Sequence, residues 1–133
     1  MTRSSGILLP VSALPGPCGI GDLGTAAREF IDFLAAAGQR YWQILPLNPP
    51  DSAHSPYLSA STFAGSTDLL SPEPFMARGA LTLDEVRSVD WGGDPMRVDY
   101  GRVHAGKTAL WAAAFAREQA AYESLMVDDM GLV

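Results

Sequence analysis

The chain has 133 residues, of which 47% are hydrophobic and 18% charged; this is the composition of a globular domain and excludes a disordered or fibrous protein. Its formal net charge of -6, with basic residues scattered singly, argues against a nucleic-acid partner, because phosphate contacts need clustered Lys and Arg. A chain of this length buries a real core, but it is too short for a complete (β/α)8 barrel of about 250 residues.

Cysteine content and the N-terminal residues bear on the cellular compartment. Cys18 is the only cysteine, so no intrachain disulfide can form and an oxidising compartment is not implied. The N-terminal apolar run ends at Pro10 and is too short for a signal peptide or a bilayer span. We therefore expect a cytoplasmic protein with no membrane partner.

The first half of the chain predicts a βαβ unit. Residues 6–10 form a buried strand, and residues 41–47 form a second strand rich in aromatic and branched side chains. Between them, Thr25 is placed to cap a helix and Gly38 to end it at the C′ position. The core-facing side of this helix is expected to comprise Ala27, Phe30, Ile31 and Leu34. A unit of this kind pairs its strands in parallel.

Residues 19–24 read GIGDLG and match the G-x-G-x-x-G pattern of dinucleotide-binding loops. That pattern works only where the first glycine directly follows a strand, and here Pro15 and Pro17 intervene. The acidic residue expected at the end of the next strand is also missing. We interpret the segment instead as a flexible loop whose glycines permit positive φ and close backbone approach.

The second half predicts helices only, with no strand after residue 75. Thr82 and Glu85 have the spacing of a capping box, which opens a short helix to about Val89. A long helical stretch follows residue 101, and residues 127–133 form a tail without a helix stop. One side of the long helix is expected to carry Val103, Lys107, Leu110, Trp111, Ala114 and Phe115. The tryptophans are expected to be packing residues: Trp42, Trp91 and Trp111.

Few residues present an evident catalytic or metal-binding pattern. His54 and His104 lack a partner at a spacing that predicts a nucleophile and base, and no set of side chains has metal-ligand spacing. Retaining glycosidic chemistry needs two carboxyl groups about 5 to 5.5 Å apart. The loop carboxylates that sequence alone does not pair are Asp22, Asp51, Asp68 and Asp99.

The loop after the second strand is the expected site, because ligands of α/β proteins meet the carboxyl ends of strands. Tyr57, held between Pro56 and small residues, can lay its ring against the apolar face of a sugar, and Ser55 can supply a hydroxyl. The alternative is that Tyr57 packs against Phe63 as a structural residue.

Several segments then stand in a recognisable order: SSGILL (4–9), LPGP (14–17), GIGDLG (19–24), RYWQ (40–43), LPL (45–47), SPY (55–57), FAG (63–65) and VDY (98–100), followed by Lys107. Together they resemble the start of the 4-α-glucanotransferases, also called amylomaltases or disproportionating enzymes. The resemblance runs from about residue 4 to about residue 117, and the tail at 127–133 is unlike the family.

The resemblance implies a retaining transferase that moves α-1,4-glucan segments between maltooligosaccharides, without metal or organic cofactor. An aspartate nucleophile and a glutamate acid/base would act through a covalent glycosyl-enzyme. These carboxylates lie beyond residue 133 in the family, so no catalytic residue is expected in this chain. Ser55 and Tyr57 match family positions that line the donor-sugar subsites, and we assign them as substrate-binding residues.

Two of the departures from the family pattern bear on glucan binding. Ser52 stands where similar enzymes tend to have a tyrosine, and His104 stands where some have an aromatic residue that helps to bind long glucans. Transfer among short maltooligosaccharides is therefore better supported than action on long glucans.

We expect an α/β chain that forms the N-terminal part of a (β/α)8 TIM barrel. Residues 1–66 would supply the first two β/α units, residues 67–126 a helical insertion region, and residues 127–133 the divergent tail. Alone, the chain would be inactive, because the catalytic carboxylates are not in it. It would also be poorly soluble, because its strand edges are unpaired. Its partner would be the remainder of the barrel. The rival interpretations are a non-catalytic sugar-binding or interaction protein that keeps Tyr57, and a nucleotide-binding module that uses residues 19–24.

Overall fold

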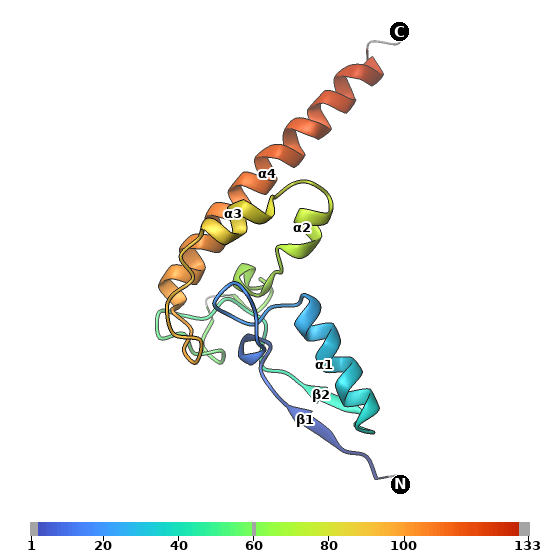
Figure 1. The fold of residues 1–133 in the computed structure, drawn as a ribbon, viewed down its shortest axis with the longest axis vertical. Helices are drawn as coiled ribbons and strands as arrows, with labels where there is room; N and C mark the ends of the chain where they lie inside the picture. The colour runs from blue at the N-terminus through green and yellow to red at the C-terminus, as the bar shows by residue number, and fades with distance from the viewer. Residues whose placement is uncertain (1–2, 60, 131–133) are drawn as a thin grey trace.

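The computed structural model describes residues 3–59 and 61–130, with helical side chains as far as residue 123. The elements, in chain order, are β1 (Gly6–Leu8), the 3-10 turn η1 (Val11–Ala13), α1 (Thr25–Ala36), β2 (Tyr41–Gln43), the 3-10 turn η2 (Thr67–Leu69), α2 (Glu73–Ala77), α3 (Leu83–Ser88) and α4 (Tyr100–Met130). The strands and α1 lie at one end of the molecule, and α4 runs past α2 and α3 toward the other (Figure 1).

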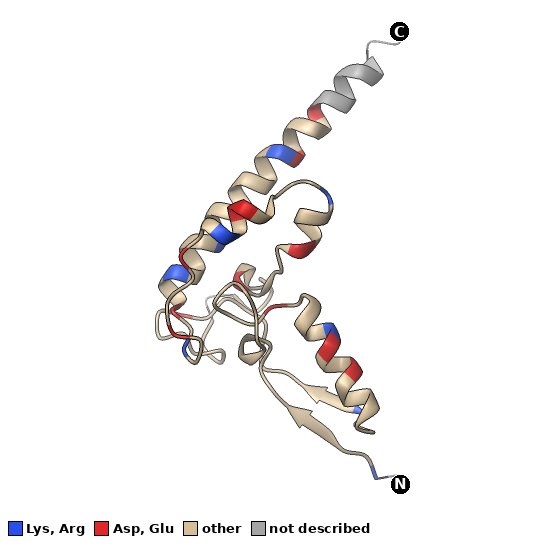
Figure 2. Cartoon of the chain, viewed as in Figure 1, with Lys and Arg blue, Asp and Glu red and all other residues tan. Residues whose placement is uncertain are grey.

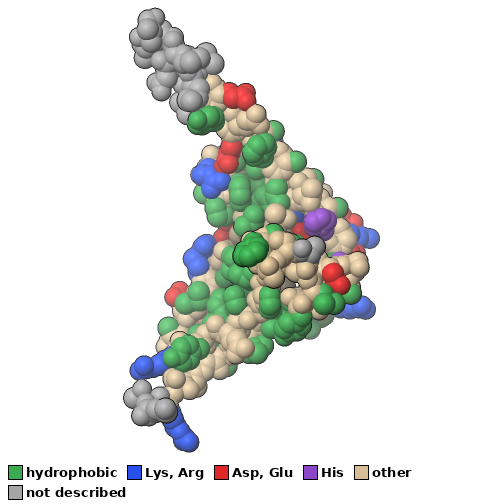
Figure 3. Space-filling view, turned by 180° about the vertical axis from the view of Figure 1, so that it is seen from behind, with side chains coloured by type: hydrophobic (Ala, Val, Ile, Leu, Met, Phe, Trp, Pro, Cys, Tyr) green, Lys and Arg blue, Asp and Glu red, His purple; other side chains and the backbone are tan. Residues whose placement is uncertain are grey.

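The predicted βαβ unit is confirmed. β1 and β2 pair in parallel, with Gly6 opposite Tyr41 and Leu8 opposite Gln43. Both strands are shorter than predicted, and the prediction that the first is buried is wrong, because Ile7 is 41% and Leu8 58% exposed. Among the described residues, α1, the loop after β1 and a few side chains that include Leu47 and Leu69 pack at this pair of strands. Hydrophobic side chains remain at the surface (Figure 3).

The start of α1 is held by a residue far along the chain. Thr25 is the first helical residue and not the cap; Gly24 occupies the cap position without a side-chain bond. Glu73 accepts hydrogen bonds from the Thr25 amide (2.9 Å), the Thr25 hydroxyl (2.8 Å) and Arg28 (3.0 Å). Its carboxylate thus satisfies one of the backbone N–H groups left free at the start of α1. At the other end, Gly38 adopts a φ of 72°, as predicted for a C′ glycine.

One hydrophobic core lies between α1 and the strands. Its buried members are Val11, Leu14 and Ala27. Phe30 meets Trp42 edge to face at 5.1 Å between ring centroids, and the Trp42 indole donates to the Leu9 carbonyl at 2.8 Å. Ile31, which was expected on this side, is 52% exposed. Fewer side chains of α1 are therefore buried than its sequence pattern predicts.

A second core lies among α2, α3 and α4. Its buried residues are Cys18, Ala80, Leu81, Val86, Leu110 and Ala114. The capping box of Thr82 and Glu85 is confirmed at the start of α3. Phe115 was expected on the packed side of α4 but is 69% exposed. Cys18, from the loop after β1, joins this helical core and so ties the two halves of the chain together.

The tryptophans are packing residues, as predicted. Each is partly buried, and each indole donates to a backbone carbonyl: Trp42 to Leu9, Trp91 to Val86 at 3.0 Å, and Trp111 to Thr67 at 3.1 Å. Such half-buried indoles keep their N–H satisfied while their rings fill the space between elements.

Cys18 should not react with thiol reagents at neutral pH in the folded protein. Its side chain is fully buried, and burial raises the pKa of the thiol to about 11, although the nearby Lys107 ammonium acts in the opposite direction. Thiolate is the reactive form, so both its scarcity and its inaccessibility slow alkylation. We expect iodoacetamide to label Cys18 only after urea unfolding, as read by peptide mass. Rapid labelling without urea would show that the second core opens readily.

Glu85 should titrate far below an ordinary glutamate. Arg117 and the Thr82 backbone and hydroxyl donate to its carboxylate and lower its pKa from 4.5 to about 2. This pair is one of several between oppositely charged side chains that are interspersed along α3 and α4 (Figure 2). A lowered carboxyl pKa means that the pair's stabilisation is present above pH 4.5 and is lost as the pH falls toward 2.

An NMR titration of the Glu85 side-chain carboxyl checks this shift. Replacing Arg117 with alanine should bring the midpoint back toward 4.5, whereas Asp84→Asn, on the same turn, should leave it low. A midpoint near 4.5 in the unaltered protein would show that the pair with Arg117 is not formed in solution.

Candidate functional site

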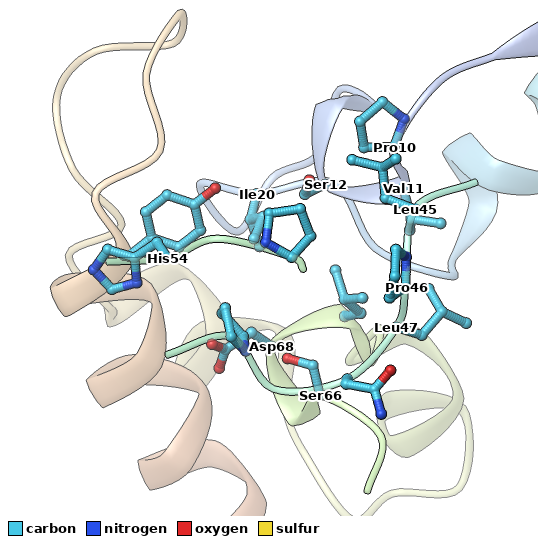
Figure 4. A pocket seen from close by; sticks show the side chains of 15 residues that line it. Pro10, Val11, Ser12, Ile20, Leu45, Pro46, Leu47, His54, Ser66 and Asp68 are labelled. Atoms are coloured by element: carbon cyan, nitrogen blue, oxygen red, sulfur yellow. The ribbon is translucent and has the colours of Figure 1, made fainter. Parts of the chain in front are cut away.

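A pocket of about 230 Å³ lies where the chain leaves the carboxyl ends of the two strands (Figure 4). Four stretches of chain and the start of α4 contribute its wall, and most of the lining is apolar. The lining residues are Pro10, Val11, Ser12 and Ile20 after β1, Leu45, Pro46, Leu47 and Asn48 after β2, Pro50, His54 and Pro56 from the following loop, Ser66, Asp68 and Leu69 near η2, and Tyr100 of α4.

Asp68 supplies the one carboxylate among these lining residues. Its side chain is 13% exposed, and His104 Nδ1 lies 3.1 Å from its Oδ1. The contact joins η2 to the first turn of α4, the two elements that form one side of the pocket. The pocket thus presents a hydrogen-bond acceptor beside apolar surface, which suits a neutral polar ligand.

The loop between β1 and α1 is fixed by a buried ion pair. Lys107 is fully buried on α4, and its ammonium lies 3.3 Å from Asp22 Oδ2 and 2.6 Å from the Leu70 carbonyl. Asp22 also accepts from the Gly24 amide at 3.0 Å. Burial raises the pKa of Asp22 above its usual value of 3.8, and the Lys107 charge opposes that rise. This pair holds residues 19–24, and with them the pocket wall at Ile20, against α4.

The glycines of residues 19–24 permit close packing and, at Gly19, a positive φ, as predicted, but the expected flexible loop is instead buried at Ile20, Gly21 and Asp22. Gly19 has a φ of 69°, and Gly21 donates its amide to the Ser12 carbonyl at 3.1 Å. A Cβ at Gly21 would lie 2.2 Å from the Val11 carbonyl oxygen. Gly21 lets the loop lie directly against η1.

The loop of residues 51–58 carries both predicted sugar contacts. Ser55 is half-buried, and its hydroxyl accepts from the Tyr57 amide at 3.4 Å. The Tyr57 ring is 72% exposed, and Phe63 is fully exposed, so the alternative that these two rings pack together is wrong. Neither Ser55 nor Tyr57 lines the pocket; their neighbours His54 and Pro56 do. Their role as sugar contacts stays a prediction.

Both histidines have partners that their sequence neighbourhood does not reveal. The His54 ring stacks on Tyr100, with 4.3 Å between ring centroids and 9° between ring planes. His104 pairs with Asp68, as described above. His54 remains exposed to solvent, as is usual for a loop histidine, although one face of its ring is covered by Tyr100. No sequence pattern indicates the positive φ of 58° at His54. Nor does one indicate its contact with Tyr100, which lies far along the chain.

The four loop carboxylates are already engaged with the protein. Asp22 faces Lys107 and Asp68 faces His104, as above. Asp51 accepts from the Ala53 amide at 3.0 Å, and Asp99 lies 3.2 Å from the Arg102 guanidinium. Each therefore has a structural partner. That the catalytic carboxylates lie beyond this chain stays a prediction.

The described residues hold no group of three or more His, Cys, Asp or Glu side chains suited to a metal ion. Within residues 3–59 and 61–130, no helix combines the length and apolar character needed to cross a bilayer.

Comparison with known proteins identifies the family. The sequence profile of the family described as 4-alpha-glucanotransferase matches residues 9–129. A 4-alpha-glucanotransferase of Streptococcus pneumoniae serotype 4 is 41% identical over 115 residues, which cover 86% of this chain and 23% of that protein. The 4-alpha-glucanotransferase of Thermus thermophilus is 44% identical over 115 residues, which cover 86% of this chain and 22% of that protein.

A solved structure agrees with the sequence matches. The amylomaltase from Streptococcus agalactiae in complex with acarbose superposes with a TM-score of 0.83 and 31% identity, over 97% of this chain and 27% of that one. The chain thus spans about a quarter of the length of the proteins it matches. It belongs to the 4-alpha-glucanotransferase family.

Proposed function

We propose that the polypeptide carrying this sequence transfers α-1,4-glucan segments between maltooligosaccharides by a retaining double displacement. The observation that carries the proposal is the family match over residues 9–129, supported by relatives that are named 4-alpha-glucanotransferases. In the proposed reaction a carboxylate outside this chain forms the glycosyl-enzyme, and the 4-hydroxyl of a second sugar releases the glucan in place of water.

Within that reaction, we assign Ser55 and Tyr57 to binding of the donor sugar. Tyr57 offers an exposed ring on a loop that leaves the carboxyl end of β2, where a hexose ring can lie against it. The S. agalactiae amylomaltase was solved with acarbose, which supports a sugar ligand for the family. The contact would orient the donor for attack and would not itself exchange protons or form bonds.

We further propose that this chain supplies the first strands of a (β/α)8 barrel and the start of a helical insertion. Parallel strands normally have neighbours at both edges and helices on both faces. Here Ile7, Leu8 and Tyr41 are largely exposed on the strand pair, and Phe33 is exposed on α1. The rest of a barrel would cover these side chains, which supports it as the partner of this chain. A single buried cysteine suits the cytoplasm, where thiols stay reduced.

The test of function is disproportionation of maltotriose by the native polypeptide that carries this sequence. Intact mass of that polypeptide, isolated from its own cells, comes first because it defines the molecule to assay. We expect glucose and longer maltooligosaccharides from pure maltotriose, with retained anomeric configuration. Maltotriose binding without any product would contradict the transferase and favour the non-catalytic sugar-binding alternative.

Tyr57→Ala should raise the Kd for maltotriose by about tenfold, the loss expected for removing one aromatic platform. Because the native polypeptide is expected to convert maltotriose, initial rates of disproportionation measure the change as a matching rise in KM. Tyr57→Phe should retain most of the affinity, because the ring remains. Phe63→Ala is the matched control, since Phe63 is a fully exposed aromatic residue on the same connection. Equal affinity for Tyr57→Ala and the unaltered protein would remove Tyr57 from the site.

A further inference from the structure

The ring stack of His54 on Tyr100 joins the 51–58 loop to the first residue of α4. The ring centroids are 4.3 Å apart and the planes differ by 9°, so the two faces are in contact. Close aromatic pairs of this kind stabilise the arrangement that brings them together. His54 lies at the side of the pocket nearest to the helix (Figure 4).

Among the described residues, the hydrogen bonds of the 51–58 loop are internal to it. The Asp51 amide donates to the Leu58 carbonyl at 2.9 Å, and the Leu58 amide donates to the Ser55 carbonyl at 3.2 Å. The Asp51 carboxylate accepts from the Ala53 amide at 3.0 Å and from the Ser55 amide at 3.4 Å. These bonds set the shape of the loop, and none of them joins it to another element.

We propose that His54 and Tyr100 are positioning residues for the sugar contacts at Ser55 and Tyr57, and that they act through their ring stack. Ser55 directly follows His54, and its hydroxyl accepts from the Tyr57 amide, so a shift of His54 displaces both contacts. The buried Lys107 anchors α4. The ring stack therefore holds the exposed 51–58 loop against a rigid part of the molecule.

The inference rests on the proposed function, since it assigns a role relative to the donor sugar. It concerns residues to which the resemblance assigns no role: His54 occupies a loop whose sequence departs from the family pattern, and Tyr100 is matched only as part of the VDY segment (98–100). The φ of 58° at His54 is a conformation that His and Asn adopt more readily than most residues. His54→Asn therefore removes the ring while keeping the backbone conformation.

The experiment compares two variants that remove one ring each, His54→Asn and Tyr100→Ala, in the native polypeptide. We expect each to weaken maltotriose binding by about threefold to tenfold, the size of one stacking contact. The double variant should be no weaker than either single variant, because both remove the same contact. Tyr100→Phe, which keeps the ring, is the matched control and should change affinity by less than about twofold.

A second readout follows the loop directly. Hydrogen exchange of the Ala53, Tyr57 and Leu58 amides should accelerate in both ring-removing variants and stay unchanged in Tyr100→Phe. Cys18 should remain protected from iodoacetamide in every variant, which shows that the fold is retained.

Unchanged affinity in His54→Asn, with the unaltered protein still binding maltotriose, would overturn the positioning role while leaving the proposed function in place. An unaltered protein without maltotriose affinity would overturn the proposed function. In that case, faster amide exchange in His54→Asn and Tyr100→Ala, but not in Tyr100→Phe, would still support the conclusion that the ring stack holds the loop in place. Unchanged exchange in all three variants would overturn that conclusion.

Discussion

Lys107→Met is expected to lower the free energy of unfolding by about 3–5 kcal/mol, the cost of leaving a buried charge without its partner. Lys107 is the only lysine of the chain and is fully buried on α4. Its ammonium faces Asp22 and the Leu70 carbonyl, and it lies 6.0 Å from the centre of the Trp111 ring. Methionine fills a similar volume but leaves the Asp22 carboxylate buried without a cation.

The matched control is Arg78→Met. Arg78 pairs with Glu118 at 2.7 Å, but both side chains are about half exposed, so its removal should cost less than about 1 kcal/mol. The measurement is urea unfolding of the native polypeptide, followed by brief alkylation of Cys18 at each urea concentration. Equal losses for the two variants would show that the Lys107 pair is not desolvated in solution.

The partner of Lys107 supplies a second check. Asp22→Asn keeps an oxygen for the Gly24 amide and removes the negative charge. Lys107→Met with Asp22→Asn should therefore be less destabilised than the sum of the single variants, by about 0.5–3 kcal/mol.

Acid should also lessen the loss in Lys107→Met. Burial already raises the pKa of Asp22. In Lys107→Met the positive charge that opposed this rise is gone. A raised carboxyl pKa means that the folded state binds a proton more tightly than the unfolded chain, so stability falls as the pH rises above 3.8. The difference between Lys107→Met and the unaltered protein should be smaller at pH 4 than at pH 7. A difference that grows in acid would contradict the assigned partner.

Local sequence signals predicted the local structure well. The strand, helix and strand of the βαβ unit, the C′ position of Gly38 and the capping box of Thr82 and Glu85 depend on residues close together in the chain. For Gly38 and for the capping box, the same short segment both carries the signal and forms the structure. Such features do not need knowledge of distant contacts.

Features that depend on contacts between distant residues were not predicted from the sequence. Thr25 looked like a cap because Ser and Thr often occupy that position, but the Glu73 carboxylate takes over that role from α2. Burial of β1 was predicted from its apolar residues, yet burial depends on which elements cover a strand, and few do so here. The stack of His54 on Tyr100 has no local signal of any kind.

Lys107 shows what a closer reading of the pattern offers. The sequence placed it on the apolar side of the long helix, with Val103 and Leu110, where a lysine is out of place unless it is paired. In the structure Lys107 is fully buried there, and it is paired with a carboxylate. Only the structure selects Asp22 from the four loop carboxylates, because the choice depends on how the 19–24 loop folds against α4.

Gly21→Ala is the second change with a large expected effect, a loss of about 3 kcal/mol in the free energy of unfolding. The added Cβ would lie 2.2 Å from the Val11 carbonyl oxygen, 2.6 Å from the Leu14 carbonyl oxygen and 2.7 Å from the Leu14 amide nitrogen. All three atoms belong to the backbone, so no side chain can rotate away, and the loop must move off η1.

Such movement reaches the candidate site, because the neighbouring Ile20 and the displaced Val11 both line the pocket. Gly21→Ala should therefore weaken maltotriose binding as well as stability, and Cys18 should become easier to alkylate. Gly93→Ala is the control: a Cβ there meets nothing within 4 Å, and its φ is not positive, so stability should change by less than about 0.5 kcal/mol. If Gly21→Ala unfolded at the same urea concentration as Gly93→Ala, the packing of the 19–24 loop against η1 would be wrong, and with it the pocket wall that this loop supports.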